Sequence, residues 1–162
     1  MRTTMLLLLM ITGSNLFAQT DSFDVFIYTK PVFFETSGTS DELRFHLTNV
    51  DGNSCTITLY KSRPAKVDIM HDITSQWKVV KQLPKADKKP VKILTEQFWD
   101  GWASTLAIGN YYHNKKKAIV MLQSFRKNNT TAFAVIAFND KIFKETVENF
   151  SKNLHLTPQT PK

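Results

Sequence analysis

The chain has a single cysteine among its 162 residues, Cys55, so it cannot form an internal disulfide. Small secreted domains with little core are usually cross-linked by several disulfides, and this chain is not of that type. Cys55 stands in an alternating run and shares its parity with Ile57 and Leu59. We therefore expect its side chain to face the core as a small apolar group, and the fold to be stabilised by core packing.

Glycine is also scarce, with 5 residues, and the motifs built on it are missing. The chain has no Gly-x-Ser-x-Gly nucleophile turn and no glycine-rich loop for phosphate. None of the four histidines stands at the spacing of a metal site: His46, His71, His113 and His155. Asp68, His71 and Asp72 fall on one expected helix, where we favour a solvated polar surface. We thus expect no catalytic residue, no metal and no cofactor, with a hydrolase of unrecognised type as the less favoured alternative.

Long apolar runs are missing as well, because the most apolar stretch is only Met5 to Ile11. A membrane-spanning helix needs roughly 20 apolar residues, so no membrane span is expected. The positive Arg2, this short apolar run and the small Ala18 together form the pattern of a cleavable signal peptide. The sequence thus predicts a signal peptide over residues 1–18 and an exported protein, periplasmic or secreted after cleavage.

The charge is positive, with a formal net charge of +7 that falls to +6 when Arg2 leaves with the signal peptide. The lysines are spread over several expected loops rather than gathered in one motif. An exported protein rarely meets nucleic acid, so we interpret the lysines as a solvated surface that aids solubility. No nucleic-acid partner is expected.

Most of the remaining pattern predicts strands. Alternating or continuous apolar residues place them at 23–28, 43–48, 54–61, 91–98, 102–112, 118–125 and 132–138. Asp51-Gly52 and Asp100-Gly101 predict tight turns between neighbouring strands, and residues 114–117 predict a basic turn. Residues 35–41 have the composition of a loop. A break or bulge is expected where Gly109 interrupts its strand.

Two amphipathic helices complete the pattern. The first is expected to begin at Ser62 and to end near Leu83, with this apolar stripe: Val67, Ile69, Met70, Ile73, Trp77 and Val80. The second is expected to be capped by Asp140, with this stripe: Phe143, Val147, Phe150 and Leu154. The sequence therefore predicts a single α+β domain over residues 19–156, followed by a frayed tail at 157–162. Its sheet is twisted and mostly antiparallel, with about six to seven strands covered by two helices.

Several segments resemble a known group. Residues 24–33, which contain Tyr28-Thr29-Lys30-Pro31, resemble the strand that opens a group of exported Gram-negative proteins of unknown function. Residues 55–62 resemble their central strand, and Trp77, the Asp100-Gly101-Trp102 turn and the Phe-rich closing helix also fit. The group is similar in outline to the PsbP-like fold, shared by a photosystem subunit and a Ran-binding nuclear import factor. The resemblance covers most of residues 23–156 and implies no activity, because this fold serves unrelated binding tasks.

Aromatic residues flank the turns in the middle of the chain: Trp99, Trp102, Tyr111 and Tyr112. Aromatics at sheet edges can contact a partner or line a ligand pocket, whereas Trp99 or Trp102 can equally fill the core between sheet and helix. The first hypothesis is a non-catalytic binding or accessory protein that engages an unknown protein of the cell envelope. The alternative is a carrier with a pocket for a small apolar ligand between sheet and helices.

Overall fold

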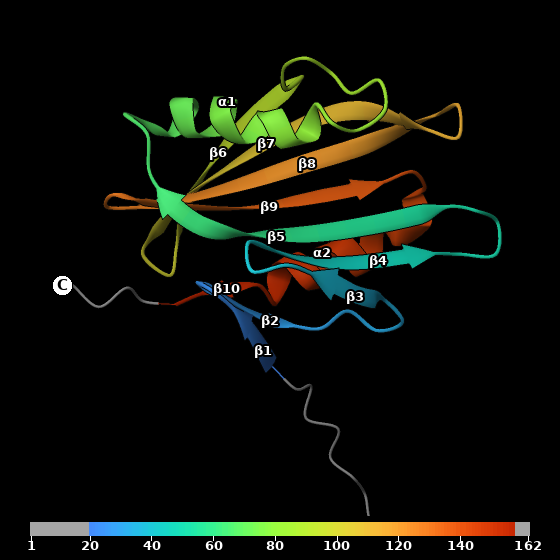
Figure 1. Cartoon of the computed structure of the whole chain (residues 1–162), viewed down its shortest axis with the longest axis horizontal. Coiled ribbons are helices and arrows are strands. Elements are labelled where there is room, and N and C mark those ends of the chain that lie inside the picture. Colours follow the sequence, from blue (N-terminus) through green and yellow to red (C-terminus); the bar gives the residue numbers. More distant parts are fainter. Residues whose placement is uncertain (1–19, 158–162) are drawn as a thin grey trace, which may run out of the picture.

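A computed structural model describes residues 20–157, apart from the side chains of residues 95–99. The predicted signal peptide and the residues after 157 therefore lie outside the described part. The elements run in the order β1 (Thr20–Phe23), β2 (Phe26–Thr29), β3 (Glu35–Gly38), β4 (Glu42–Thr48), β5 (Ser54–Pro64), α1 (Ile69–Val80), β6 (Lys92–Trp99), β7 (Trp102–His113), β8 (Lys116–Lys127), β9 (Thr130–Phe138), a 3-10 turn (Lys141–Phe143), α2 (Lys144–Lys152) and β10 (His155–Leu156). Figure 1 shows this arrangement.

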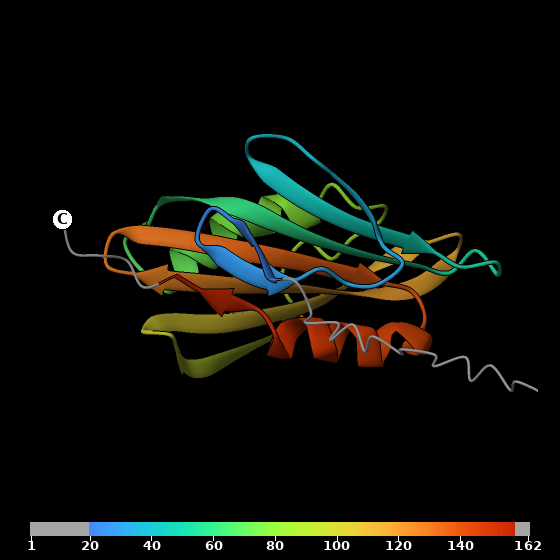
Figure 2. The same cartoon turned by 90° about the horizontal axis from the view of Figure 1, so that it is seen from below.

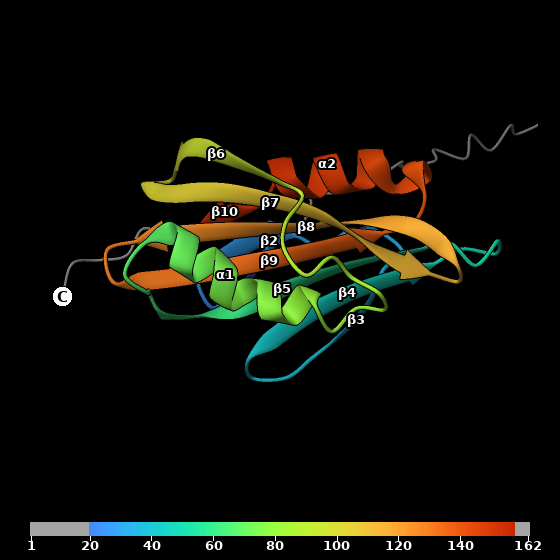
Figure 3. The ribbon, with the colours of Figure 1, turned by 90° about the horizontal axis from the view of Figure 1, so that it is seen from above.

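The larger sheet has seven antiparallel strands in the order β3-β4-β5-β9-β8-β7-β6. Helix α1 lies over β8 and β9 on one face (Figure 3), and α2 lies on the opposite face (Figure 2). Each helix has one apolar side, and it buries that side against the sheet. The predicted α+β class, with a mostly antiparallel sheet covered by two helices, is confirmed.

A second, three-stranded sheet of β1, β2 and β10 was not expected. Its strand β10 pairs with β2 and buries Leu156 beside Phe26, on the same face of the large sheet as α2. β1 and β3 were also missed, because their residues are almost all solvent-exposed and carry no apolar alternation. The loop expected at residues 35–41 is thus wrong for β3, which pairs with β4 as the edge of the large sheet.

The first helix begins later than the sequence predicted. β5 continues to Pro64, because its end pairs with β9 beyond an irregularity between Tyr60 and Arg63. Asp68 rather than Ser62 caps α1, and its carboxylate accepts a hydrogen bond of 2.9 Å from the backbone N–H of His71. With the helix starting at Ile69, the predicted buried stripe shortens to its later members, and Val67 and Met70 are exposed.

The break expected at Gly109 is also wrong, because β7 pairs with β8 in regular register through this residue. The glycine is needed for packing: a Cβ at position 109 would lie 2.8 Å from Cζ2 of Trp77 on α1. Trp77 is fully buried, and its indole N–H donates to the carbonyl of Asp87 at 3.0 Å. The strand therefore has no side chain at the point where the indole ring touches its backbone.

The single strand predicted at residues 23–28 is wrong, because a turn at residues 24 and 25, where Asp24 has a φ of 53°, separates β1 from β2. Several other local predictions are confirmed. The turns at Asp51-Gly52 and Asp100-Gly101 are formed, and both glycines have positive φ, at 74° and 77°. Asp140 caps the 3-10 turn that leads into α2, and the whole predicted stripe of the second helix is buried. Cys55 is buried in the core on the α2 face of the sheet, as its parity predicted.

Candidate functional site

The four aromatic residues singled out from the sequence do not form one site. Trp102 is fully buried on the α2 face, where its indole N–H donates to the carbonyl of Thr157 at 3.2 Å. Tyr111 is buried on the opposite face beside α1, and this burial raises the pKa of its phenol to about 12. Tyr112 is exposed, and the side chain of Trp99 lies outside the described part. The aromatic cluster expected as a contact surface is therefore not assembled.

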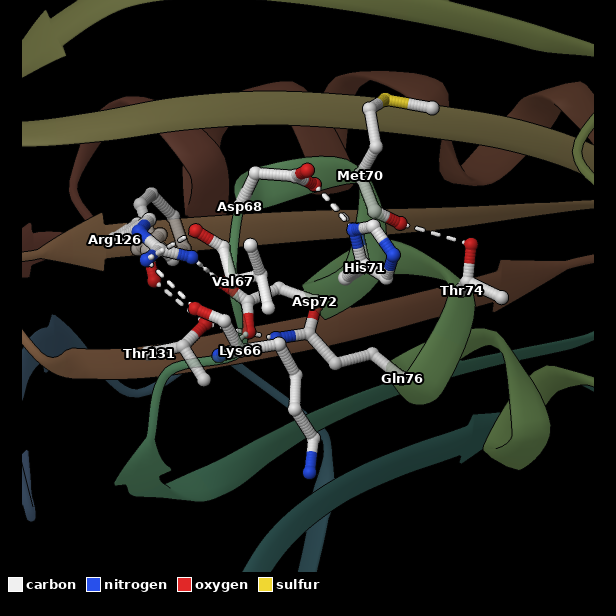
Figure 4. Close-up of polar contacts among 11 residues, drawn as sticks. Lys66, Val67, Asp68, Met70, His71, Asp72, Thr74, Gln76, Arg126 and Thr131 are labelled. Carbon is white, nitrogen blue, oxygen red and sulfur yellow. Dashed lines mark hydrogen bonds and ion pairs between the residues drawn. The ribbon is translucent and has the colours of Figure 1, made fainter.

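Asp72 of α1 is not part of a solvated surface, contrary to the sequence interpretation. Its side chain is fully buried and binds Nη1 of Arg126 on β8 at 2.6 Å. The same carboxylate accepts the backbone N–H of Lys66 at 2.7 Å, and Nη2 of Arg126 donates to the Lys66 carbonyl at 2.8 Å. Figure 4 shows these contacts between the start of α1 and the sheet. We interpret this network as an anchor for the helix, because every charged member has a partner inside the protein.

His71 and Asp68 form a solvent-exposed pair, with Nδ1 of the ring 2.9 Å from the carboxylate. The backbone N–H of His71, and then its ring, hold the pKa of Asp68 below its usual value. Among the described side chains of residues 20–157, no group of three or more His, Cys, Asp or Glu is arranged to hold a metal ion. Within the same range, no helix is long and apolar enough to cross a membrane.

The strongest candidate site is a groove of about 530 Å³ between the sheet and α2, which we call the α2 groove. Its floor and walls are mainly apolar: Ile108, Ala118, Ile119, Met121, Phe138 and Val147. Polar and charged residues line the rest: Lys117, Asn139, Asp140, Lys141, Lys144 and Glu148. This volume is within the range of pockets that bind small molecules, roughly 300–1,000 Å³.

The sheet pairing explains how the floor is built. Ile108 of β7 lies directly opposite Met121 of β8, and Ile119 of β8 lies directly opposite Phe138 of β9. Such cross-strand neighbours form a continuous apolar surface on one face of the sheet. Val147 faces this surface from α2.

The floor stays open because α2 packs toward another part of this face, where the ring of Phe150 lies 6.0 Å from that of Phe45 on β4. A helix of 9 residues is about 14 Å long, whereas strands of 12 residues such as β7 and β8 extend for about 40 Å. The three-stranded sheet packs elsewhere on the same face, with Tyr28 against Phe45 of β4 and Phe26 against Phe125 near the other end of β8. Ile119 is consequently 43% exposed, although its strand is paired with a neighbour on each side.

A second groove of about 550 Å³ lies on the opposite face, beyond the end of α1. We call it the α1 groove, and its lining includes Arg44, His46, Tyr60 and Tyr111. The ring nitrogens of His46 are hydrogen-bonded to the hydroxyls of Thr56 at 2.8 Å and Thr48 at 3.0 Å. A polar lining of this kind is usual for the solvated face of an antiparallel sheet, so the α2 groove is the better candidate.

The sequence predicts a buried strand at residues 118–125, which corresponds to most of β8 but does not reveal the groove. The available signal was parity: Lys117, Ile119 and Met121 share one face of the strand, and Ala118, Val120 and Leu122 share the other. The second set is buried under α1. Only the position of α2 over the sheet shows that Ile119 is uncovered.

Comparison with known proteins supports the fold alone. The structure is similar to that of PA94, a protein of unknown function from Pseudomonas aeruginosa, with a TM-score of 0.51 and 12% sequence identity over 83% of this chain and 92% of that one. LpqN of Mycobacterium tuberculosis, which is involved in cell envelope biogenesis, gives a TM-score of 0.42 and 12% identity over 82% and 71% of the two chains. A protein from Bacteroides thetaiotaomicron gives 0.48 and 10% identity over 85% and 47%.

No model of a known protein family and no curated protein sequence matches this chain. At 12% identity, the likeness to PA94 concerns the arrangement of helices and strands and carries no activity with it.

Proposed function

We propose that this chain is an exported, non-catalytic binding protein of the cell envelope, and that it holds a small apolar ligand in the α2 groove. The observation that carries the proposal is the open apolar floor, above all the 43% exposure of Ile119 on a strand that is paired on both sides. Export rests on the signal-peptide pattern of residues 1–18. The PsbP-like kinship belongs to the same proposal and rests on the sequence resemblance described above.

An apolar ligand suits this groove for a simple physical reason. Covering Ile108, Ile119 and Met121 removes apolar surface from water, which stabilises a complex by roughly 25 cal/mol per Å² before the costs of binding are subtracted. Each methylene group that is added to a ligand and buried contributes about 0.8 kcal/mol. Longer alkyl chains should therefore bind up to about fourfold more tightly per methylene until the floor is covered.

The first test uses an uncharged fluorescent apolar probe such as N-phenylnaphthylamine. The wild-type protein is expected to bind it, and Ile119→Glu is expected to weaken binding by about tenfold or more, because ligand would then cover a carboxylate. Val67→Glu is the matched control, since it adds the same charge at an exposed valine before α1. Equal binding by the three proteins, all with unchanged thermal stability, would contradict the α2 groove as the site.

The second test is native mass spectrometry of the protein purified from its own host. The proposal expects a bound small molecule, which organic solvent should extract. A mass that corresponds to the bare mature chain would count against a carrier.

A second candidate function, binding of an envelope protein through a loop, is favoured by the turn at residues 31–34. Phe33 has a φ of 69° and its side chain is 88% exposed, with the exposed Val32 beside it. An apolar side chain in water on a strained backbone is a combination that often marks a contact surface. Crosslinking from position 33 in intact cells tests this candidate. The candidate fails if no protein is crosslinked, or if the same proteins are crosslinked whether or not position 33 carries an aromatic side chain.

A further inference from the structure

The charged residues of the α2 groove are unevenly placed. From them we infer that the ligand is a single-chain amphiphile with an anionic head group, which Lys117 and Lys141 bind at one end of the groove. This inference rests on the function proposed above and specifies its ligand class. It concerns the chemistry of the head group, whereas the proposed function concerns only the apolar chain.

The topology brings the two lysines to the same end of the floor. Lys117 is the second residue of β8, and Ile119 follows on the same face of that strand. Ile119 pairs with Phe138, the last residue of β9, and Lys141 follows three residues later in the 3-10 turn. Both lysines therefore lie where β8 begins and β9 ends.

The apolar part of the groove extends away from this end. Met121 lies two residues further along the same face of β8, and Ile108 lies opposite it on β7. Val147 follows Lys141 by more than one helical turn along the same segment. A ligand with its polar head at the lysines would thus lay its chain over Ile119 and Met121.

The carboxylates that line the groove are already engaged. Glu148 forms an ion pair with Lys144, at 3.7 Å between Oε1 and Nζ. Asp140 accepts the backbone N–H of Ile142 at 3.0 Å as it caps the 3-10 turn. Three lysines and two carboxylates line the groove, which leaves one positive charge in excess.

Lys117 and Lys141 form no ion pair with any carboxylate of residues 20–157. Lys115 and Lys116, in the adjoining turn and at the start of β8, add to the positive potential at this end. An ammonium group forms charge-assisted hydrogen bonds with carboxylate or phosphate oxygens, which are stronger than those between neutral groups. A carboxylate or phosphate head is therefore favoured over a neutral or cationic one.

The size of the preference follows from the exposure of the lysines. Both side chains are exposed, and exposed ion pairs contribute little because water and salt screen them. We expect an anionic amphiphile to bind about tenfold more tightly than an alcohol with the same chain at low salt. The alkyl chain provides most of the affinity, and the head group sets the selectivity and the orientation.

The experiment measures displacement of the neutral probe by four ligands with the same alkyl chain: dodecanoate, dodecyl phosphate, dodecanol and dodecyltrimethylammonium. All are used below their micelle concentrations in low-salt buffer. For wild-type protein we expect both anions to bind more tightly than the alcohol, and the alcohol to bind more tightly than the cation. Raising salt from about 10 mM to about 500 mM should shrink the difference between anion and alcohol, because the Debye length falls severalfold.

The variant Lys117→Gln/Lys141→Gln should bind dodecanoate and dodecanol with the same affinity, while its affinity for dodecanol stays at the wild-type value. The matched control is Lys78→Gln/Lys88→Gln, which removes the same charge from exposed lysines on α1 and in the loop after it. This control should keep the preference for the anions. If the control loses the preference as well, net charge rather than the two groove lysines is responsible, and the inference fails.

The two proposals fail in different ways. Equal affinity of wild-type protein for dodecanoate and dodecanol, with normal probe binding, would overturn the head-group inference and leave the apolar groove intact. Probe binding that does not respond to Ile119→Glu would instead overturn the groove.

Discussion

Replacing Arg126 with methionine should destabilise the protein strongly, because the buried carboxyl group of Asp72 would lose its ion-pair partner. The side chain of Asp72 is 0% exposed and that of Arg126 is 20% exposed, with 2.6 Å between the paired atoms. Breaking a buried ion pair from one side costs about 3–5 kcal/mol, a large part of the roughly 5–15 kcal/mol that stabilises a typical domain. For a domain of this size, this corresponds to a melting temperature lowered by roughly 10–20 °C.

The double variant Asp72→Leu/Arg126→Met isolates the cause. It removes the buried charge together with its partner, so it should be more stable than Arg126→Met by at least about 1 kcal/mol. It should not reach wild-type stability, because the backbone N–H of Lys66 loses its acceptor at 2.7 Å, which costs about 1–3 kcal/mol if the group stays buried. Urea unfolding followed by circular dichroism gives the three free energies.

A surface pair provides the matched control. Arg44 binds Glu42 at 2.8 Å, but the two side chains are 46% and 27% exposed. Exposed pairs contribute about 0–1 kcal/mol, so Arg44→Met should change the melting temperature by only a few degrees. Equal losses in Arg44→Met and Arg126→Met would refute the argument from burial, and so would a double variant less stable than Arg126→Met.

Three further predictions concern single positions. Gly109→Ala should lower the free energy of unfolding by about 1–3 kcal/mol, because the new Cβ would lie 2.8 Å from Trp77; a circular dichroism melt identical to wild type would contradict this packing. Phe33→Gly should raise the free energy of unfolding by about 1 kcal/mol, because a left-handed backbone is strained for phenylalanine and removal of its exposed ring loses little buried apolar surface. Val32→Gly should lower the free energy of unfolding, because Val32 has no positive φ that glycine would relieve. Finally, burial raises the pKa of the Cys55 thiol to about 12, so iodoacetamide at mildly alkaline pH should modify only unfolded protein; rapid labelling of the native chain would show that the thiol is accessible.

The sequence predicted best those features that local chemistry determines. Asp51-Gly52 forms its turn because glycine tolerates a positive φ, and the stripe ending at Leu154 is buried because its spacing matches the helical repeat. Cys55 faces the core because alternation along a strand decides which side chains point inward.

The failures concern features that depend on distant partners. The sequence does not predict three of the short strands. β1 and β3 are short and polar, and β10 is only two residues long, so their pairing becomes evident only from the strands that lie beside them. Ser62 is a residue type that caps helices, but β9 holds the end of β5 in the sheet beyond that point. Asp72 seemed a surface residue because its partner Arg126 lies 54 positions away in the sequence.

The candidate site was beyond sequence reasoning for the same reason. Trp102 and Tyr111 are large and aromatic, but they lie on opposite faces of the sheet, each inside a separate core. The sequence predicts Ile119 as one more buried strand residue, and its exposure follows only from where α2 and the small sheet pack.

The most direct test of the central claim is methyl NMR of the protein titrated with dodecanoate. The account predicts saturable shifts at the methyl groups of Ile108, Ile119 and Val147, which line the α2 groove, and none at Val79 or Val135 in the α1 groove. Shifts confined to Val79 and Val135, or no saturable shift in either groove, would contradict it.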